Sequence, residues 1–347
     1  MPNAILGIAP LGFPWPTVDP FLLCVHHDDR YPKANGRFGP AASLAGHHLG
    51  QDFFNEDGWR MYHGRAVPGF PPHPHRGFET VTIVRRGWID HSDSLGAAAR
   101  YGAGDVQWLT AGRGVVHAEM FPLLDTDAPN PLELFQIWLN LPAASKFTAP
   151  QFKMFWSRDV PHFDTVDASG ARTRVVCIAG RLADASAVLQ PPSPPRDSWA
   201  ASVDNDVAIW TMALDPGARW TLPPSRASDT RRHLYFFAGE KVGIDAQPVD
   251  AHAVIELAPG APVEFVNRGD TRAEFLLLQG RPINEPVAQH GPFVMNTELE
   301  VRQAFADYQR TQFGGWPWAE EEPVHGPHQA RLLRHPDGRV EPPPAIE

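Results

Sequence analysis

The sequence predicts an all-β protein made of two antiparallel barrels in tandem, with one short helix near the C-terminus. Short runs rich in β-branched and aromatic residues recur along the chain, and glycine-containing turns separate them. Such spacing is typical of small barrels and sandwiches. A second block repeats the pattern of the first, and we expect the boundary between residues 149 and 172.

The first barrel is predicted from the run of short strands that ends near Leu141. A long polar segment with glycine and proline, residues 26–70, interrupts this run and is typical of a functional or covering loop. The histidine pairs at 26–27 and 47–48 are interpreted as solvated or hydrogen-bonded loop residues. Strands are expected at residues 20–25, 78–84, 88–93, 106–109 and 132–140.

The second barrel precedes the only helix that is well signalled. Thr297 and Glu300 form a capping box, and apolar residues at helical spacing follow until Phe313. The proline-rich, charged tail after Trp318 is expected to be disordered or to lie on the surface. Strands are expected at 174–178, 207–214, 233–237, 254–257, 263–266 and 274–278, and domains at 1–160, 161–315 and 316–347.

Composition limits the possible functions. The 347 residues carry a net charge of −10, which argues against direct binding of nucleic acid. The apolar start, Met1 to Pro16, has no basic residue and several prolines, so it is not interpreted as a signal peptide. No apolar run is long enough to cross a membrane, and only Cys24 and Cys177 are cysteines. We therefore expect a cytoplasmic protein without a membrane contact.

Two short motifs predict a metal site in the first barrel. His73 and His75 stand two residues apart where a strand begins, and His117 and Glu119 repeat this spacing. On an extended backbone, residues i and i+2 point to the same face. Two such strands would direct four ligands inward. Neutral imidazoles with one carboxylate suit a borderline metal such as Fe(II), Ni(II), Cu(II), Zn(II) or Mn(II).

Longer motifs surround these ligands and recur near the helix. They are HPHRGFETV (73–81), HSDS (91–94), GDVQWLTAGRG (104–114), VHAEM (116–120) and EPVAQHGPFVMNT (285–297). These motifs resemble the pirin family of the cupin superfamily, over roughly residues 20–313.

The resemblance implies two tandem cupin barrels, of the double-stranded β-helix or jelly-roll type. It further implies that His73, His75, His117 and Glu119 hold iron, with Ni, Cu, Mn, Co or Zn as alternatives, and that the second barrel is metal-free. Residues 33–68 and the tail extend the family pattern.

Glu79 is the ambiguous carboxylate near the motif. It follows His75 by four residues, so a regular strand would place both on one face. The matching pirin residue is not a ligand, and we assign Glu79 to orienting a histidine, with direct ligation as the alternative. Residues interpreted as structural are Arg76, Gln107, Arg113, His233 and His252.

The resemblance implies a quercetin 2,3-dioxygenase-like activity. Three neutral histidines and one carboxylate would leave a divalent metal with one positive charge and two open positions, for an enolate oxygen and O2. The substrate would be a small aromatic enol or flavonol, with Glu119 as the catalytic proton acceptor. The alternative is a redox-sensing iron protein that binds a transcription regulator or metabolic enzyme without turnover. A third hypothesis is a metal-stabilised fold without enzymatic activity.

Overall fold

A computed structural model describes residues 4–55, 57–183, 188–245, 247–250 and 252–344. Strands dominate the described chain, and its one α-helix lies near the C-terminus, which confirms the predicted all-β class. No helix in this part of the chain has the length and apolar character that a membrane crossing needs.

The chain forms two compact units, and each unit is built from three separate segments of the sequence. The histidine-site unit comprises residues 26–137, 141–158 and the chain from Glu285 onward. The apolar unit comprises the chain up to Val25, residues 138–140 and residues 159–284. This division differs from the linear boundaries predicted at residues 160 and 315.

One sheet of the histidine-site unit has the order β10-β7-β4-β9-β2. Its central strand β4 is rich in β-branched residues, and side chains from Phe78 to Val84 are all buried. The edge strand β2 continues to Tyr31, so His26 and His27 lie in a strand and not in the predicted loop. The bounds are β2 Phe21–Tyr31, β4 Phe78–Arg86, β7 Val106–Thr110, β9 Asn130–Asn140 and β10 Gln151–Phe155.

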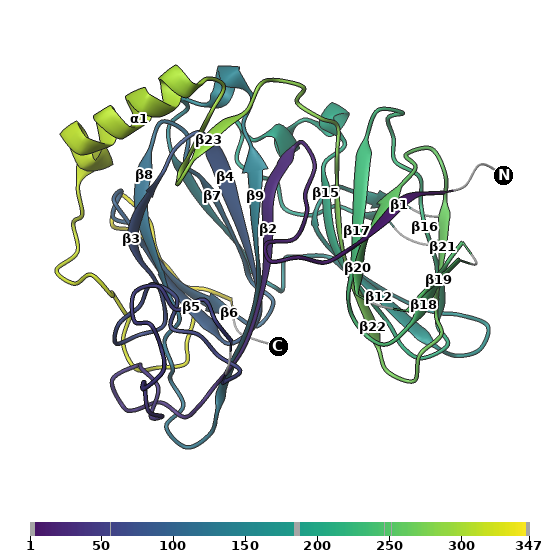
Figure 1. Cartoon of the computed structure of the whole chain (residues 1–347), viewed down its shortest axis with the longest axis horizontal. Coiled ribbons are helices and arrows are strands. Elements are labelled where there is room, and N and C mark those ends of the chain that lie inside the picture. The colour runs from purple at the N-terminus through teal and green to yellow at the C-terminus, as the bar shows by residue number, and fades with distance from the viewer. Residues whose placement is uncertain (1–3, 56, 184–187, 246, 251, 345–347) are drawn as a thin grey trace. The chain divides into compact units, whose positions relative to one another are not determined.

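The other sheet of this unit has the order β26-β25-β6-β5-β8-β3, and Figure 1 shows β3, β8, β5 and β6 side by side. Buried apolar side chains from the two sheets, including Val84, Ile89, Tyr101 and Leu134, form one core. The bounds are β3 Gly69–His75, β5 Trp88–Asp93, β6 Ala98–Gly102, β8 Val115–Met120, β25 Leu332–Arg334 and β26 Val340–Glu341.

The C-terminal tail is part of this sheet, which corrects the expectation that it is disordered or merely covers the surface. Strand β25 pairs with β6, and Leu333 is buried in the core. Arg331 donates hydrogen bonds of 2.7 and 2.6 Å to the two carboxylate oxygens of Asp105. The tail is ordered because it supplies a cation to a buried carboxylate and a side chain to the core.

The apolar unit is a second barrel with an interior of large apolar side chains, among them Trp210, Phe236, Phe265 and Phe275. Its large sheet has the order β1-β20-β17-β22-β15-β12-β11, and β1 was not predicted. Strand β1 pairs with β20, and its Ile5 is buried. The small sheet has the order β16-β21-β18-β19, beside a β13-β14 pair.

The strands of the apolar unit have these bounds: β1 Ile5–Pro10, β11 His162–Val166, β12 Arg172–Ala179, β13 Leu182–Ala183, β14 Val188–Leu189, β15 Ala208–Leu214, β16 Arg219–Leu222, β17 Arg231–Ala238, β18 Val242–Ile244, β19 Gln247–Val249, β20 Ala253–Leu257, β21 Val263–Asn267 and β22 Ala273–Gly280.

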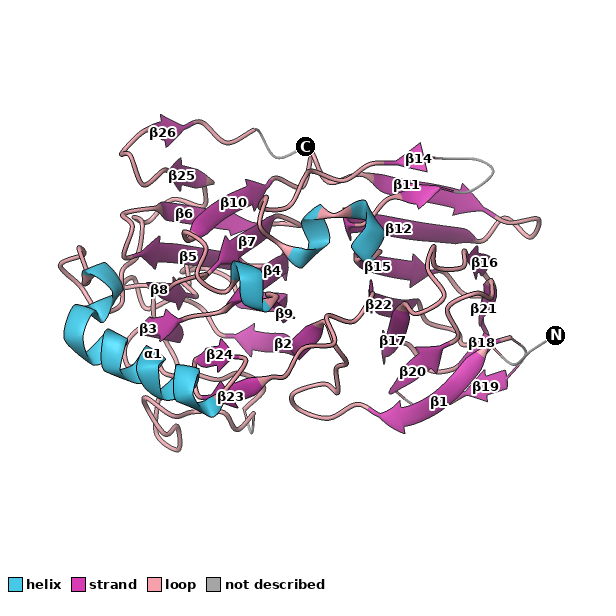
Figure 2. Cartoon of the chain, turned by 90° about the horizontal axis from the view of Figure 1, so that it is seen from above, coloured by secondary structure: helices cyan, strands magenta, loops and turns pink. Residues whose placement is uncertain are grey.

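The predicted helix is confirmed as α1, Glu298–Thr311, with the hydroxyl of Thr297 accepting a hydrogen bond from the backbone N–H of Glu300. Val301 packs against Ala288 and Met295 of the hairpin β23–β24, beside which Figure 2 shows the helix. The remaining bounds are β23 Ala288–His290, β24 Phe293–Met295, and short 3-10 helices at Ala143–Ser145, Trp199–Ala201, Val203–Asn205 and Gln312–Gly314.

The Arg331–Asp105 pair predicts that the tail stabilises the histidine-site unit. The two side chains are 3% and 0% exposed, so Arg331→Ala would leave a buried carboxylate without its cation. We expect a loss of about 3–5 kcal/mol in the free energy of unfolding, measured by urea denaturation.

The control is Arg174→Ala, which removes a bidentate pair with Asp164 whose side chains are 55% and 47% exposed. That change should cost at most about 1 kcal/mol. Equal effects of the two changes would contradict a stabilising role of the tail.

Candidate metal centre

The register of three antiparallel strands brings the predicted ligands together. Strand β3 pairs with β8 so that His73 lies directly opposite His117. Strand β5 pairs with the other side of β8, where His91 lies opposite Glu119 and Asp93 opposite His117. Directly opposed residues share a face of a sheet. The predicted ligands His73, His117 and Glu119 therefore share one face with His91 and Asp93 of β5.

The three predicted histidines form a compact cluster. Each offers one ring nitrogen that lies within 4.8 Å of those of the other two. The ring centroid of His73 is 4.4 Å from that of His117 and 4.7 Å from that of His75. His75 and His117 are buried, whereas His73 is partly exposed. The cluster therefore meets solvent on the side of His73.

Glu119, the fourth predicted ligand, lies beside this cluster. Its Oε2 is 3.9 Å from Nε2 of His117. Oε1 accepts a hydrogen bond of 3.2 Å from the hydroxyl of Thr82, and Oε2 accepts one of 2.8 Å from Nε2 of Gln136. Burial raises the pKa of Glu119, and the nearby His91 and these two hydrogen bonds oppose that shift. The carboxylate is therefore held in one orientation next to the histidines.

The cluster fits a metal ion by its chemistry. Burial lowers the pKa of His73 to about 4 and lowers the pKa values of His75 and His117 below the usual value, so the three imidazoles are neutral at pH 7. Both ring nitrogens of His117 are buried and have no hydrogen-bond partner among the residues that the structure describes. Such orphaned nitrogens are costly unless a ligand satisfies them. Neutral imidazole nitrogens are the donors that first-row metals prefer.

Glu79 lies elsewhere than its spacing predicts. The chain turns at Gly77, whose φ is +88°, so His75 ends β3 and Glu79 belongs to the separate strand β4. The count of four residues along one strand therefore does not apply. The carboxylate of Glu79 accepts a hydrogen bond of 2.6 Å from the hydroxyl of Thr110 on β7. The role of Glu79 in orienting a histidine stays a prediction.

Two further polar groups near the cluster were not predicted as site residues. The ring of His91 lies 5.5 Å from that of His117, and its Nε2 is 3.2 Å from a carboxylate oxygen of Asp93. Thr82 and Gln136 hold Glu119 from neighbouring strands. The repeated i, i+2 spacing in HSDS was the available signal for His91 and Asp93. Nothing local in the sequence indicates Thr82 or Gln136, because they reach Glu119 from the other sheet and their role depends on how the two sheets pack.

Three of the histidines that were interpreted as structural or hydrogen-bonded form such contacts. His26 pairs with Glu133 at 3.1 Å and His47 with Asp52 at 2.6 Å. His252 lies 3.1 Å from the carbonyl oxygen of Gly239. Arg76 is engaged in a different way, because it forms an ion pair of 2.9 Å with Asp307 of α1.

Two barrels in tandem, with a histidine cluster inside one of them, define a bicupin. The family model described as Pirin matches residues 17–139, and the Pirin C-terminal cupin domain matches residues 209–314. Pirin-1 of Arabidopsis thaliana is 36% identical over 252 residues, which are 71% of this chain and 78% of that protein. Pirin of Homo sapiens is 32% identical over 257 residues, 73% of this chain and 80% of that protein. The chain therefore belongs to the pirin family.

The fold comparison leads to the same architecture. The crystal structure of quercetin 2,3-dioxygenase from Acinetobacter baumannii matches with a TM-score of 0.66 at 27% identity. The match covers 90% of this chain and 98% of that chain. The predicted resemblance and the predicted pair of cupin barrels are thus confirmed.

The neutral histidines predict that the metal-free protein is sensitive to acid. Their pKa values are lowered in the folded state, so the unfolded chain binds more protons below its own histidine pKa of about 6.5. The stability that the neutral histidines contribute is therefore present above pH 6.5 and is lost as the pH falls toward 4. We expect the thermal midpoint of chelator-treated protein to drop by several degrees between pH 7 and pH 5.

The histidine contribution is isolated by His117→Gln, which removes one buried imidazole. Burial raises the pKa of Asp29 to about 6. The stability that this carboxyl contributes therefore changes with pH in the opposite direction to that of the histidines. The variant should show a shallower fall of the thermal midpoint between pH 7 and pH 5 than the wild type. An identical pH profile of the two proteins would show that the buried histidines do not determine acid stability.

Proposed function

We propose that this chain is a metal-dependent dioxygenase that acts on flavonol-type substrates such as quercetin with O2. The observation that carries the proposal is the buried cluster of His73, His75 and His117, whose neutral ring nitrogens converge within 4.8 Å. Glu119 would complete the set of ligands. Membership of the pirin family and the fold match to a quercetin 2,3-dioxygenase support this choice of reaction.

The ligand set suits Fe(II), with Ni, Cu, Mn, Co or Zn as alternatives that the same donors accept. A bound ion would supply Lewis acidity and open positions for an enolate oxygen and for O2. His73, His75 and His117 would orient the ion and keep it inside the barrel. His75 and His117 are buried, so water and substrate approach from the side of His73.

Glu119 is the residue proposed to move a proton. Its Oε2 is 3.9 Å from Nε2 of His117, and the carboxylate would accept the proton of the substrate hydroxyl after moving away from the metal. Burial already favours the protonated form of this carboxyl, which makes it a stronger base than an exposed glutamate. Thr82 and Gln136 would hold the carboxyl in position during this transfer.

The first test concerns the metal. We expect purified wild-type protein to bind one equivalent of a divalent metal, measured by elemental analysis, and His117→Ala to bind none. The matched control is His162→Ala, because His162 is an exposed histidine on β11. Full metal content in His117→Ala would refute the assignment of the site.

The second test concerns turnover. We expect metal-loaded wild-type protein to consume quercetin with uptake of O2, followed by absorbance and by an oxygen electrode. Glu119→Gln keeps the size of the side chain but is a poor proton acceptor, and should react roughly 100-fold more slowly. If the loaded wild type consumes no quercetin, the dioxygenase proposal fails. The alternative of a redox-sensing regulator would then be tested by oxidation-dependent binding of a protein partner.

A further inference from the structure

Three aromatic rings form a continuous surface that ends at His73. We name Phe53, His63 and Phe70 the aromatic surface. Phe53 lies 5.1 Å from His63 and 6.5 Å from Phe70, measured between ring centroids, and His63 lies 5.6 Å from Phe70. The ring of Phe70 is 6.2 Å from that of His73. Two of the three rings come from the segment 33–68, which extends the family pattern.

The aromatic surface lies on the accessible side of the histidine cluster. Phe53 is 39% exposed, His63 is exposed and Phe70 is partly exposed. His73 is the cluster histidine that is partly exposed, and it is also the one that Phe70 contacts. A ligand that reaches the cluster from this side passes the aromatic surface.

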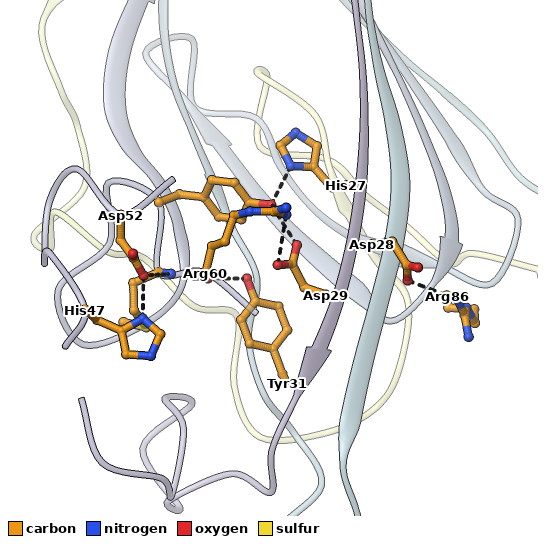
Figure 3. A network of polar contacts seen from close by, with 10 residues as sticks. His27, Asp28, Asp29, Tyr31, His47, Asp52, Arg60 and Arg86 are labelled. Atoms are coloured by element: carbon orange, nitrogen blue, oxygen red, sulfur yellow. Dashed lines mark hydrogen bonds and ion pairs between the residues drawn. The ribbon is translucent and has the colours of Figure 1, made fainter. Parts of the chain in front are cut away.

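A buried polar network holds this segment in place (Figure 3). Tyr62, the residue before His63, donates a hydrogen bond of 2.7 Å to Asp29 of β2. Arg60 donates to the other oxygen of Asp29 at 3.2 Å and lies close to it in Figure 3. Nδ1 of His63 lies 2.6 Å from the carbonyl oxygen of Gly50. His63 and the backbone beside it are therefore preorganised, which reduces the entropy lost when a ligand binds.

We propose that the aromatic surface selects planar aromatic ligands for the histidine site by stacking against their rings. The inference rests on the proposed function, because it takes the histidine site as the place where the ligand's oxygen atoms bind. Aromatic rings prefer offset-stacked or edge-to-face partners, and each such pair adds binding energy beyond the buried area. A small aliphatic ligand that binds only the metal gains nothing from these rings.

Phe54 provides a matched control within the same segment. It is 69% exposed, and the ring contact described for it is with His48 at 6.5 Å. Phe53→Ala and Phe54→Ala remove the same side chain from adjacent positions. Only the first change removes a ring from the aromatic surface.

The experiment measures binding and not turnover. Wild type, Phe53→Ala and Phe54→Ala are loaded with redox-inert Zn(II), and elemental analysis verifies the loading. Quercetin, 2,3-dihydroxynaphthalene and acetohydroxamate are titrated without oxygen, and binding is followed by fluorescence or calorimetry. We expect Phe53→Ala to bind both aromatic probes about three- to tenfold more weakly than wild type. Acetohydroxamate should bind all three proteins equally, and Phe54→Ala should match wild type throughout.

Four outcomes would overturn part of this reasoning. Unchanged affinity of Phe53→Ala for both aromatic probes would refute the inference, as would an equal weakening for acetohydroxamate. Wild type that binds 2,3-dihydroxynaphthalene but not quercetin would refute the flavonol proposal, and the inference would then be decided by the naphthalene probe. Wild type that binds acetohydroxamate and neither aromatic probe would refute both.

Discussion

The site depends on the antiparallel register of β8 between β3 and β5. Side chains alternate along a strand, so a slip of one residue would move both His117 and Glu119 to the outer face. Pairing on both sides of β8 prevents such a slip. His73 opposes His117 across one edge, and His91 opposes Glu119 across the other. The ligand geometry is therefore a property of the whole sheet, including the apolar core that holds its strands.

The two barrels use one kind of scaffold with different interiors. In the histidine-site unit, Thr82, Glu119 and Gln136 form an inward-facing hydrogen-bonded group beside the histidines. The apolar unit fills its interior with side chains such as Trp210 and Phe236. An unsatisfied buried polar group costs about 1–3 kcal/mol, so a polar interior persists only where its members bind one another or a ligand. The orphaned nitrogens of His117 are consistent with the second condition.

Local signals in the sequence were sufficient for much of the fold. The β-branched run of β4, the capping box of α1 and the i, i+2 spacing of the histidines each act within a few residues, and each agrees with the structure. Interactions between distant segments were not predictable in this way. The pairing of β1 with β20 and that of Arg331 with Asp105 each join segments that are far apart in the sequence. A local pattern shows that a strand or an arginine exists but not which partner it has.

Glu79 shows a different kind of failure, because the residue count was correct and the assumption of one continuous strand was not. Gly77 adopts a conformation that residues with side chains rarely adopt and separates β3 from β4. The sequence predicts the segment 33–68 as part of a long functional or covering loop. The contact between the rings of Phe53 and His63 and the buried Asp29–Tyr62 hydrogen bond arise from tertiary packing, which composition does not predict.

The interleaving of the two units along the chain limits how recombination can rearrange this protein. A fragment that stopped near residue 160 would lack α1 and β25, and the remaining fragment would lack β1 and leave the backbone edge of β20 unpaired. Neither barrel is formed by one continuous segment of the chain that recombination could move or delete on its own. A single cut in the chain therefore cannot separate the two barrels, because the apolar unit takes β1 from the N-terminal end and the histidine-site unit takes α1 and β25 from the C-terminal end.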